Sequence, residues 1–155
     1  MPLNRRTLLM AAASLAALPA IPAPAQARPA MHVRKDPDCG CCGDWIAILR
    51  EAGFDLTVQE MPNADLARFK LARGIAPDLA SCHTAEIAGY VVEGHVPPAD
   101  IDRLLAERPD AVGLSVPGMP WGAPGMGPES ERDAYDVVLI GRDGGRTVFS
   151  RYDAA

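Results

Sequence analysis

Three of the four cysteines of this 155-residue chain lie in one tetrapeptide, Cys39–Gly40–Cys41–Cys42. Residues 31–35, just before it, alternate between apolar and polar side chains, which predicts a short strand. After it, apolar residues recur at helical spacing and predict a helix from near Cys42 to Gly53. The motif therefore lies between a strand and the start of a helix, where free amides and the helix dipole favour thiolate. This placement favours an α/β fold.

The rest of the chain extends this pattern to a single α/β domain. It predicts strands at 54–61, 86–92, 135–140 and 147–152, and helices at 63–73 and from Pro97 onward. Residues 109–134 are rich in Pro and Gly without a period, which predicts a long loop. The expected order is β-α-β-α-β-α-β-β, a mixed sheet with flanking helices. Thioredoxin-like proteins carry a cysteine motif between the first strand and first helix, although the third helix departs from their usual order.

The first 27 residues have the pattern of an export signal. Arg5 and Arg6 precede an apolar run at 8–21, and Ala25–Gln26–Ala27 forms a small-residue cleavage site. The run is too short for a membrane helix, which needs about 20 apolar residues. We therefore predict a signal peptide at 1–27, cleaved near Ala27, a flexible lead-in at 28–30 and one domain at 31–153. The paired arginines resemble a twin-arginine signal, and the ordinary secretory route stays open.

Charge limits the expected partners. The whole chain carries a net charge of −5, and cleavage removes two arginines and no acids, which gives −7 for the mature protein. An acidic chain without a basic cluster argues against nucleic acid and anionic membranes as partners. Metal cations are the better expectation. The predicted signal implies an exported protein, with no membrane attachment of the mature form.

The cysteines allow three interpretations. In an oxidising compartment an even number of cysteines defaults to disulfides, so a disulfide-stabilised module without metal is one of them. The C-x-x-C spacing of Cys39 and Cys42 suits a thiol–disulfide oxidoreductase. Cys41 favours a metal, because a dithiol enzyme has no use for a third thiol in its loop. Structural zinc usually takes two separated pairs, and only Cys82 follows, so zinc is disfavoured and Cu(I) is favoured.

Further donors lie outside the tetrapeptide. His83 adjoins Cys82, His95 opens a turn, and the tripeptide Pro-Gly-Met occurs twice, with thioether donors at Met119 and Met126. The predicted metal residues are Cys39, Cys41, Cys42, Cys82, His83, His95, Met119 and Met126. No paired catalytic carboxylates, Ser/His/Asp set or phosphate-binding loop is evident. The sequence therefore favours a metal-binding protein over a conventional enzyme, and leaves a copper or thiol oxidoreductase open.

Four motifs in order carry a family resemblance. They are Lys35-x-Pro37-x-Cys39-Gly40-Cys41-Cys42-Gly43-x-Trp45, Ser81–Thr84, Gly89–Pro97 and Ala111–Pro120. Together they resemble the domain of unknown function 411 family, which includes exported CopG-type copper-resistance proteins, and the match covers roughly residues 31–152. The resemblance implies a thioredoxin-like fold, a periplasmic location and copper bound by the clustered cysteines with Cys82; the family's histidine and methionine positions appear here as His83, His95, Met119 and Met126.

The resulting hypothesis is a thiolate-bridged Cu(I) cluster of several ions, formed by Cys39, Cys41, Cys42 and Cys82 and completed by His or Met side chains. Its expected role is copper handling in copper resistance, with Cu(I)/Cu(II) cycling. The expected partners are metal ions and other periplasmic copper-handling proteins.

Overall fold

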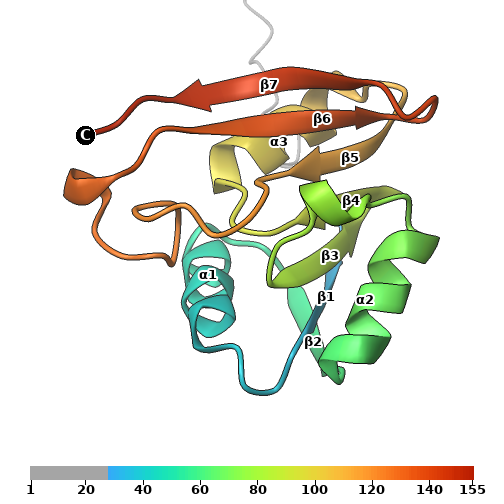
Figure 1. Cartoon of the computed structure of the whole chain (residues 1–155), viewed down its shortest axis with the longest axis horizontal. Helices are drawn as coiled ribbons and strands as arrows, with labels where there is room; N and C mark the ends of the chain where they lie inside the picture. Colours follow the sequence, from blue (N-terminus) through green and yellow to red (C-terminus); the bar gives the residue numbers. More distant parts are fainter. Residues whose placement is uncertain (1–27) are drawn as a thin grey trace, which may run out of the picture.

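The computed structural model describes residues 28–155 (Figure 1). The predicted export signal at 1–27 lies outside these residues. The strands are β1 (Met31–Lys35), β2 (Leu56–Glu60), β3 (His83–Ile87), β4 (Tyr90–Glu93), β5 (Ala111–Ser115), β6 (Tyr135–Gly141) and β7 (Arg146–Tyr152). The helices are α1 (Gly40–Glu51), α2 (Asn63–Ala72) and α3 (Pro98–Glu107), with 3₁₀ turns at Pro77–Leu79 and Glu129–Glu131.

The strands form one mixed sheet in the order β2-β1-β3-β4-β5-β6-β7. The pairs β1–β2 and β4–β5 are parallel, because a helix connects the two strands of each pair, and the other pairs are antiparallel. The mixed α/β architecture predicted from the sequence is confirmed.

The two faces of the sheet carry different chemistry. Strand alternation directs Ala85 and Val92 to the face covered by α1 and α3, where they join the larger core. Thr84 and Glu93 point to the opposite face, where Lys70 of α2 contacts both of them. Figure 1 shows α1 and α2 on opposite sides of β1 and β3. The larger core is built around Trp45, Leu49, Ile101 and Leu104.

The predicted single strand at 86–92 is wrong, because this segment is a hairpin of β3 and β4. The two-residue turn lies at Ala88 and Gly89, which have φ of 49° and 86°. Positive φ at both central positions matches the twist of an antiparallel pair. Apolar residues on both sides of an Ala–Gly pair concealed a turn that Asn–Gly would have marked.

The predicted loop at 109–134 is also wrong in part, since it contains β5. This strand pairs with β4 and β6 in the interior of the sheet, and Ala111 and Leu114 are fully buried. An interior strand shows no clear alternation of apolar and polar residues, which is the signal that the sequence lacked. The observed order is therefore β-α-β-α-β-β-α-β-β-β.

Other elements agree with the sequence within a few residues. Helix α1 begins at Gly40, two residues before the predicted start, with Cys39 as its N-cap residue. Helix α3 begins at Pro98, and β6 and β7 form the predicted hairpin. The cysteine motif therefore lies at a helix N-terminus, as expected.

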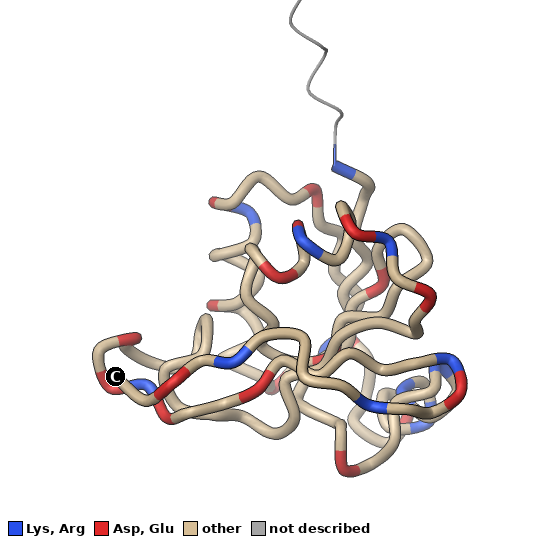
Figure 2. The backbone as a smooth tube through the Cα atoms, turned by 90° about the horizontal axis from the view of Figure 1, so that it is seen from above, with Lys and Arg blue, Asp and Glu red and all other residues tan. Residues whose placement is uncertain are grey.

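Charges of both signs are interspersed along the described backbone (Figure 2). Many form ion pairs between distant segments, such as Arg28 with Asp102 at 2.8 Å. None of the helices within residues 28–155 has the length and apolar character needed to cross a membrane.

Candidate metal centre

The cysteine motif, Cys82 and two histidines meet at one end of the sheet. The motif follows β1 directly, and Cys82 and His83 stand at the start of β3. Strands β1 and β3 are antiparallel neighbours in which Lys35 pairs with His83, so the end of one strand meets the start of the other. His95 follows β4, which is the other neighbour of β3.

The four sulfur atoms lie within 4.8 Å of one another. Cys39 and Cys42 are joined by a disulfide, while Cys41 and Cys82 are free. The Cys41 Sγ lies 3.7 Å from the Cys39 Sγ and 3.9 Å from the Cys82 Sγ. The structure therefore brings the four predicted cysteines together, in a state where two of the thiols are bonded to each other.

Cys82 also belongs to a second group of donors, with His83 and His95. Its Sγ lies 3.2 Å from the His83 Nδ1 and 3.1 Å from the His95 Nε2. The His95 Nδ1 is 2.7 Å from the carbonyl oxygen of Pro124. Because a carbonyl can only accept, the Nδ1 carries the hydrogen, and the Nε2 of the neutral ring presents its lone pair towards Cys82. This is the tautomer that a metal ligand needs.

His83 is fully buried, and its Nε2 has no hydrogen-bond partner among the described residues. The ring lies 4.3 Å from the Trp45 ring and 5.0 Å from the His95 ring. Burial lowers the pKa of both histidines, that of His83 well below its ordinary value. For His83 the nearby His95 and Lys70 lower the pKa further. For His95 the hydrogen bond to Pro124 and the charge of Asp44 raise the pKa but only partly oppose burial. Both imidazoles are therefore neutral near pH 7 and able to bind a metal ion.

Burial also acts on the free thiol of Cys82. It raises the pKa of this thiol to about 12, and the neighbouring Cys41 contributes in the same direction. A metal ion that binds the sulfur must therefore displace a proton. The two buried imidazoles, which face the Cys82 sulfur through the His83 Nδ1 and the His95 Nε2, and the adjacent soft sulfur atoms together fit a thiophilic metal.

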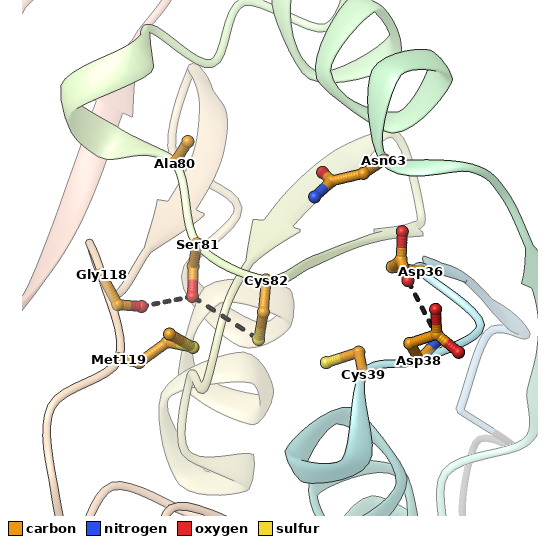
Figure 3. Close-up of a pocket in the computed structure, with 9 residues that line it drawn as sticks. All are labelled: Asp36, Asp38, Cys39, Asn63, Ala80, Ser81, Cys82, Gly118 and Met119. Carbon is orange, nitrogen blue, oxygen red and sulfur yellow. Dashed lines mark hydrogen bonds between the residues drawn. The ribbon is translucent and has the colours of Figure 1, made fainter.

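A cavity of about 450 Å³ opens beside this cluster (Figure 3). It is lined by Asp36, Asp38, Cys39, Asn63, Ala80, Ser81, Cys82, Gly118 and Met119. The Met119 side chain is 56% exposed and extends towards Cys82 in Figure 3. Met126 is half-buried and does not line this cavity, so its role as a ligand stays a prediction.

Comparison with known proteins identifies the family. A family model described as "Protein of unknown function, DUF411" matches residues 79–126, the segment that holds Cys82, both buried histidines and both loop methionines. Two solved structures titled "Copper resistance protein copG", forms 1 and 2, are 45% and 46% identical to the chain. They cover 82% and 81% of this chain and 99% and 98% of their own lengths, with TM-scores of 0.75 and 0.74. The chain belongs to the DUF411, CopG-type family. No curated protein sequence matches it.

Glu93, within this family segment, forms a buried ion pair with Lys70 that the sequence analysis missed. Glu93 is fully buried and accepts hydrogen bonds from the Lys70 ammonium at 2.5 Å and the Thr84 hydroxyl at 2.6 Å. It also accepts the backbone N–H of Ser81 at 2.7 Å. The network therefore fixes the backbone next to Cys82. A charged residue at the end of the apolar run Tyr90–Val91–Val92 was the available signal.

The second Pro-Gly-Met repeat acts through its backbone. Gly125 has φ of +83°, and a Cβ there would lie 2.6 Å from the backbone nitrogen of Trp45. This close approach places the repeat over the second turn of α1, and the neighbouring Pro124 carbonyl reaches His95. The indole of Trp45 donates to the carbonyl of Val96 at 2.9 Å, which joins the same helix to the segment after His95.

Proposed function

We propose that this protein is an exported, periplasmic copper-handling protein that binds Cu(I) at the cysteine–histidine cluster. One observation carries the proposal. Six soft or borderline donors from three separate segments converge in two groups that share Cys82, with the ligand atoms of each group within 4.8 Å. The titles of the CopG structures support copper as the cargo.

The donor set favours copper over zinc. Thiolates select Cu(I), and imidazole suits copper in either oxidation state. Because Cys82 belongs to both groups, its sulfur is the natural bridge between ions, which supports a cluster of several Cu(I) ions formed with Cys39, Cys41 and Cys42. We also propose Cu(I)/Cu(II) cycling at this site, since thiolates stabilise the lower state and the two histidines accept both. Met119, at the edge of the cavity, supplies a further soft donor.

A second candidate function is thiol–disulfide exchange by Cys39 and Cys42. The disulfide between them at the start of α1 favours it. We keep the thioredoxin-like fold as part of this proposal, which is supported by the order β1, α1, β2 with the cysteine pair at the start of α1. A disulfide-stabilised module without metal is the third candidate, although Cys82 takes no part in the disulfide.

Cu(I) titration of the fully reduced protein tests the copper proposal. The protein, purified without oxygen, competes with a chromogenic Cu(I) chelator, and the bound copper per chain is measured. We expect binding of more than one Cu(I) per chain, and its loss in the triple variant C39S/C41S/C42S. The matched control is H32Q, because His32 is exposed and lies outside both donor groups. Undiminished binding by the triple variant would overturn the proposal.

Insulin reduction by the metal-free protein tests the second candidate. Turnover that depends on Cys39 and Cys42 supports an oxidoreductase. An accessible dithiol that gives no turnover counts against it.

A further inference from the structure

The two halves of the disulfide differ in their access to solvent. Cys42, in the first turn of α1, is fully buried, whereas Cys39 is partly exposed. Cys39 also lines the cavity of about 450 Å³ beside the cluster, and Cys42 does not. A molecule that enters this cavity therefore meets the Cys39 half of the disulfide and the free thiol of Cys82 (Figure 3).

The disulfide also limits what the site can bind. It withholds two of the four sulfur donors, so loading of the cluster proposed above requires reduction of this bond by two electrons. We propose that the cavity is a binding site for a reducing thiol, which attacks Cys39 and opens the disulfide before copper loads. The importance of this step for copper loading rests on the proposed function, whereas the thiol-binding site itself is independent of it.

The reaction balances with two thiol groups. The first, as thiolate, attacks the Cys39 Sγ, forms a mixed disulfide and breaks the Cys39–Cys42 bond, whose electron pair leaves on the Cys42 sulfur. The second attacks the outer sulfur of the mixed disulfide, releases the Cys39 thiolate and forms the disulfide of the reductant. The protein gains two electrons, and the two thiolates of Cys39 and Cys42 can each take up a proton from water to become thiols.

Local structure supports Cys42 as the leaving group. It is the third residue of α1, where free backbone amides and the helix dipole stabilise the departing thiolate. Cys41 is an internal competitor, because its Sγ lies 3.7 Å from that of Cys39. Attack by Cys41 would exchange one disulfide for another and leave the number of free thiols at two, whereas an external thiol raises it to four.

The cavity wall indicates which thiols fit. Its lining includes the carboxylates of Asp36 and Asp38 and the polar side chains of Asn63 and Ser81, but no lysine or arginine. In Figure 3 the two aspartates stand beside Cys39 at the edge of the cavity. An anionic thiol is therefore repelled, and a neutral or cationic one is preferred. Two carboxylates at about 10 Å in water change an approach rate by about fourfold per unit of probe charge at low salt.

The experiment measures opening of the disulfide in the oxidised, metal-free protein with three small thiols of similar size. They are cysteamine, which is cationic, 2-mercaptoethanol, which is neutral, and 2-mercaptoethanesulfonate, which is anionic. Free protein thiols are counted after acid quenching, and rates are compared at equal thiolate concentration. Brief reaction followed by peptide mass analysis locates the first adduct. A thioredoxin-type dithiol protein, run in parallel, distinguishes a partner protein from a free small thiol as the source.

We expect the thiol count to rise from two to four, the first adduct to lie on Cys39, and cysteamine to exceed the anionic thiol by about tenfold. In D36N/D38N the ratio of the cysteamine rate to the rate of the anionic thiol should fall to about the ratio measured with a small-molecule disulfide. Asn keeps the acceptor oxygen that Asp36 offers to the Asp38 N–H, so the turn is retained. The matched control is E51Q/D55N, which removes the same charge beyond the other end of α1.

Three results would overturn the proposal: a first adduct on Cys42, an equal effect of both double variants on the ratio, or a thiol count that stays at two. None of them involves copper. Failure of the Cu(I) titration with a normal pattern of disulfide opening would instead refute the proposed function alone.

Discussion

Substitutions at Glu93 can distinguish a residue needed for the stability of the fold from one needed for metal affinity. Its carboxylate is fully buried beneath the cluster and accepts three hydrogen bonds. Glu93→Gln keeps the size and one acceptor oxygen but removes the charge. One carboxylate oxygen accepts from both the Lys70 ammonium and the Ser81 N–H, and the other accepts from the Thr84 hydroxyl. The amide oxygen of Gln can keep the first two bonds, but its NH₂ group then faces the Thr84 hydroxyl with a donor where an acceptor stood.

Two estimates of the cost agree. Hydrogen bonds to a charged group contribute about 1.5–3 kcal/mol each, and those to a neutral group about 0.5–1.5 kcal/mol each. Because Gln loses one of the three bonds and keeps the other two on a neutral oxygen, the loss is about 3–6 kcal/mol. Breaking a buried ion pair, which leaves Lys70 unpaired, costs about 3–5 kcal/mol. We therefore expect Glu93→Gln to lower the free energy of unfolding by about 4 kcal/mol, a large part of the total for a domain of this size.

Denaturant unfolding of the metal-free protein measures this cost. The double variant K70M/E93Q removes the unpaired ammonium and should recover most of the lost stability, because a buried pair replaced as a whole is nearly neutral. A Glu93→Gln cost below about 1 kcal/mol, or no recovery in the double variant, would refute the reasoning.

Copper affinity separates the positioning role from stability. In K70M/E93Q the Gln oxygen can still accept the Ser81 N–H, whereas in K70M/E93L nothing accepts it. The second variant therefore lets the backbone beside Cys82 move, and we expect its Cu(I) affinity to fall by about 10- to 100-fold relative to the first, the range seen when outer partners of ligands are lost. Equal affinities would show that the network serves folding only.

Three further predictions concern single positions. Gly125→Ala should destabilise the protein by about 1–3 kcal/mol in denaturant unfolding, because its φ of +83° and the 2.6 Å approach of the new Cβ to the Trp45 nitrogen are both unfavourable. Met119→Leu should weaken Cu(I) affinity more than Met126→Leu in chelator competition, since only the first of these two side chains lines the cavity. Burial raises the pKa of Glu86, but hydrogen bonds from two arginines outweigh it and hold the pKa below its ordinary 4.5. Its stabilisation is therefore present above pH 4.5 and lost as the pH falls through the lower folded value, so the stability difference of about 1 kcal/mol between wild type and E86Q should disappear in acid.

Sequence periodicity located the elements that have one exposed side and missed a strand that is covered on both faces. Strand β1 and the β6–β7 hairpin alternate or carry a Gly-rich turn, and both were predicted within a residue of their bounds. Strand β5 lies between two other strands and is covered on both faces, so its sequence Ala-Val-Gly-Leu-Ser has no alternation to detect. The β3–β4 turn was not predicted for a local reason, because Ala88 adopts a positive φ that its residue type disfavours.

The donor types of the candidate site were predictable, but their state was not. Cysteine and histidine chemistry singled out the six residues that the structure brings together. Sequence could not show that Cys39 and Cys42 are bonded, nor that the Pro124 carbonyl sets the tautomer of His95. The first is the oxidation state of a pair only three residues apart, which the sequence does not record. The second depends on a contact between segments 29 residues apart, which only the fold brings together. The Lys70–Glu93 pair was not predicted because 23 residues separate its two partners and only the fold brings them together.

Copper binding and the disulfide are linked through the same two sulfur atoms. Cys39 and Cys42 cannot both be thiolate ligands while they are bonded to each other, so the proposed Cu(I) binding requires the reduced protein and competes with oxidation. A ligand present at about 1,000 times its dissociation constant stabilises the form that binds it by about 4.1 kcal/mol. For a two-electron couple about 1.4 kcal/mol corresponds to 30 mV. Stabilisation of the reduced form by about 4.1 kcal/mol therefore raises the reduction potential of the disulfide by about 90 mV. Copper handling and thiol–disulfide exchange are therefore not independent alternatives for this site, because the metal concentration itself decides which of the two states the cysteines occupy.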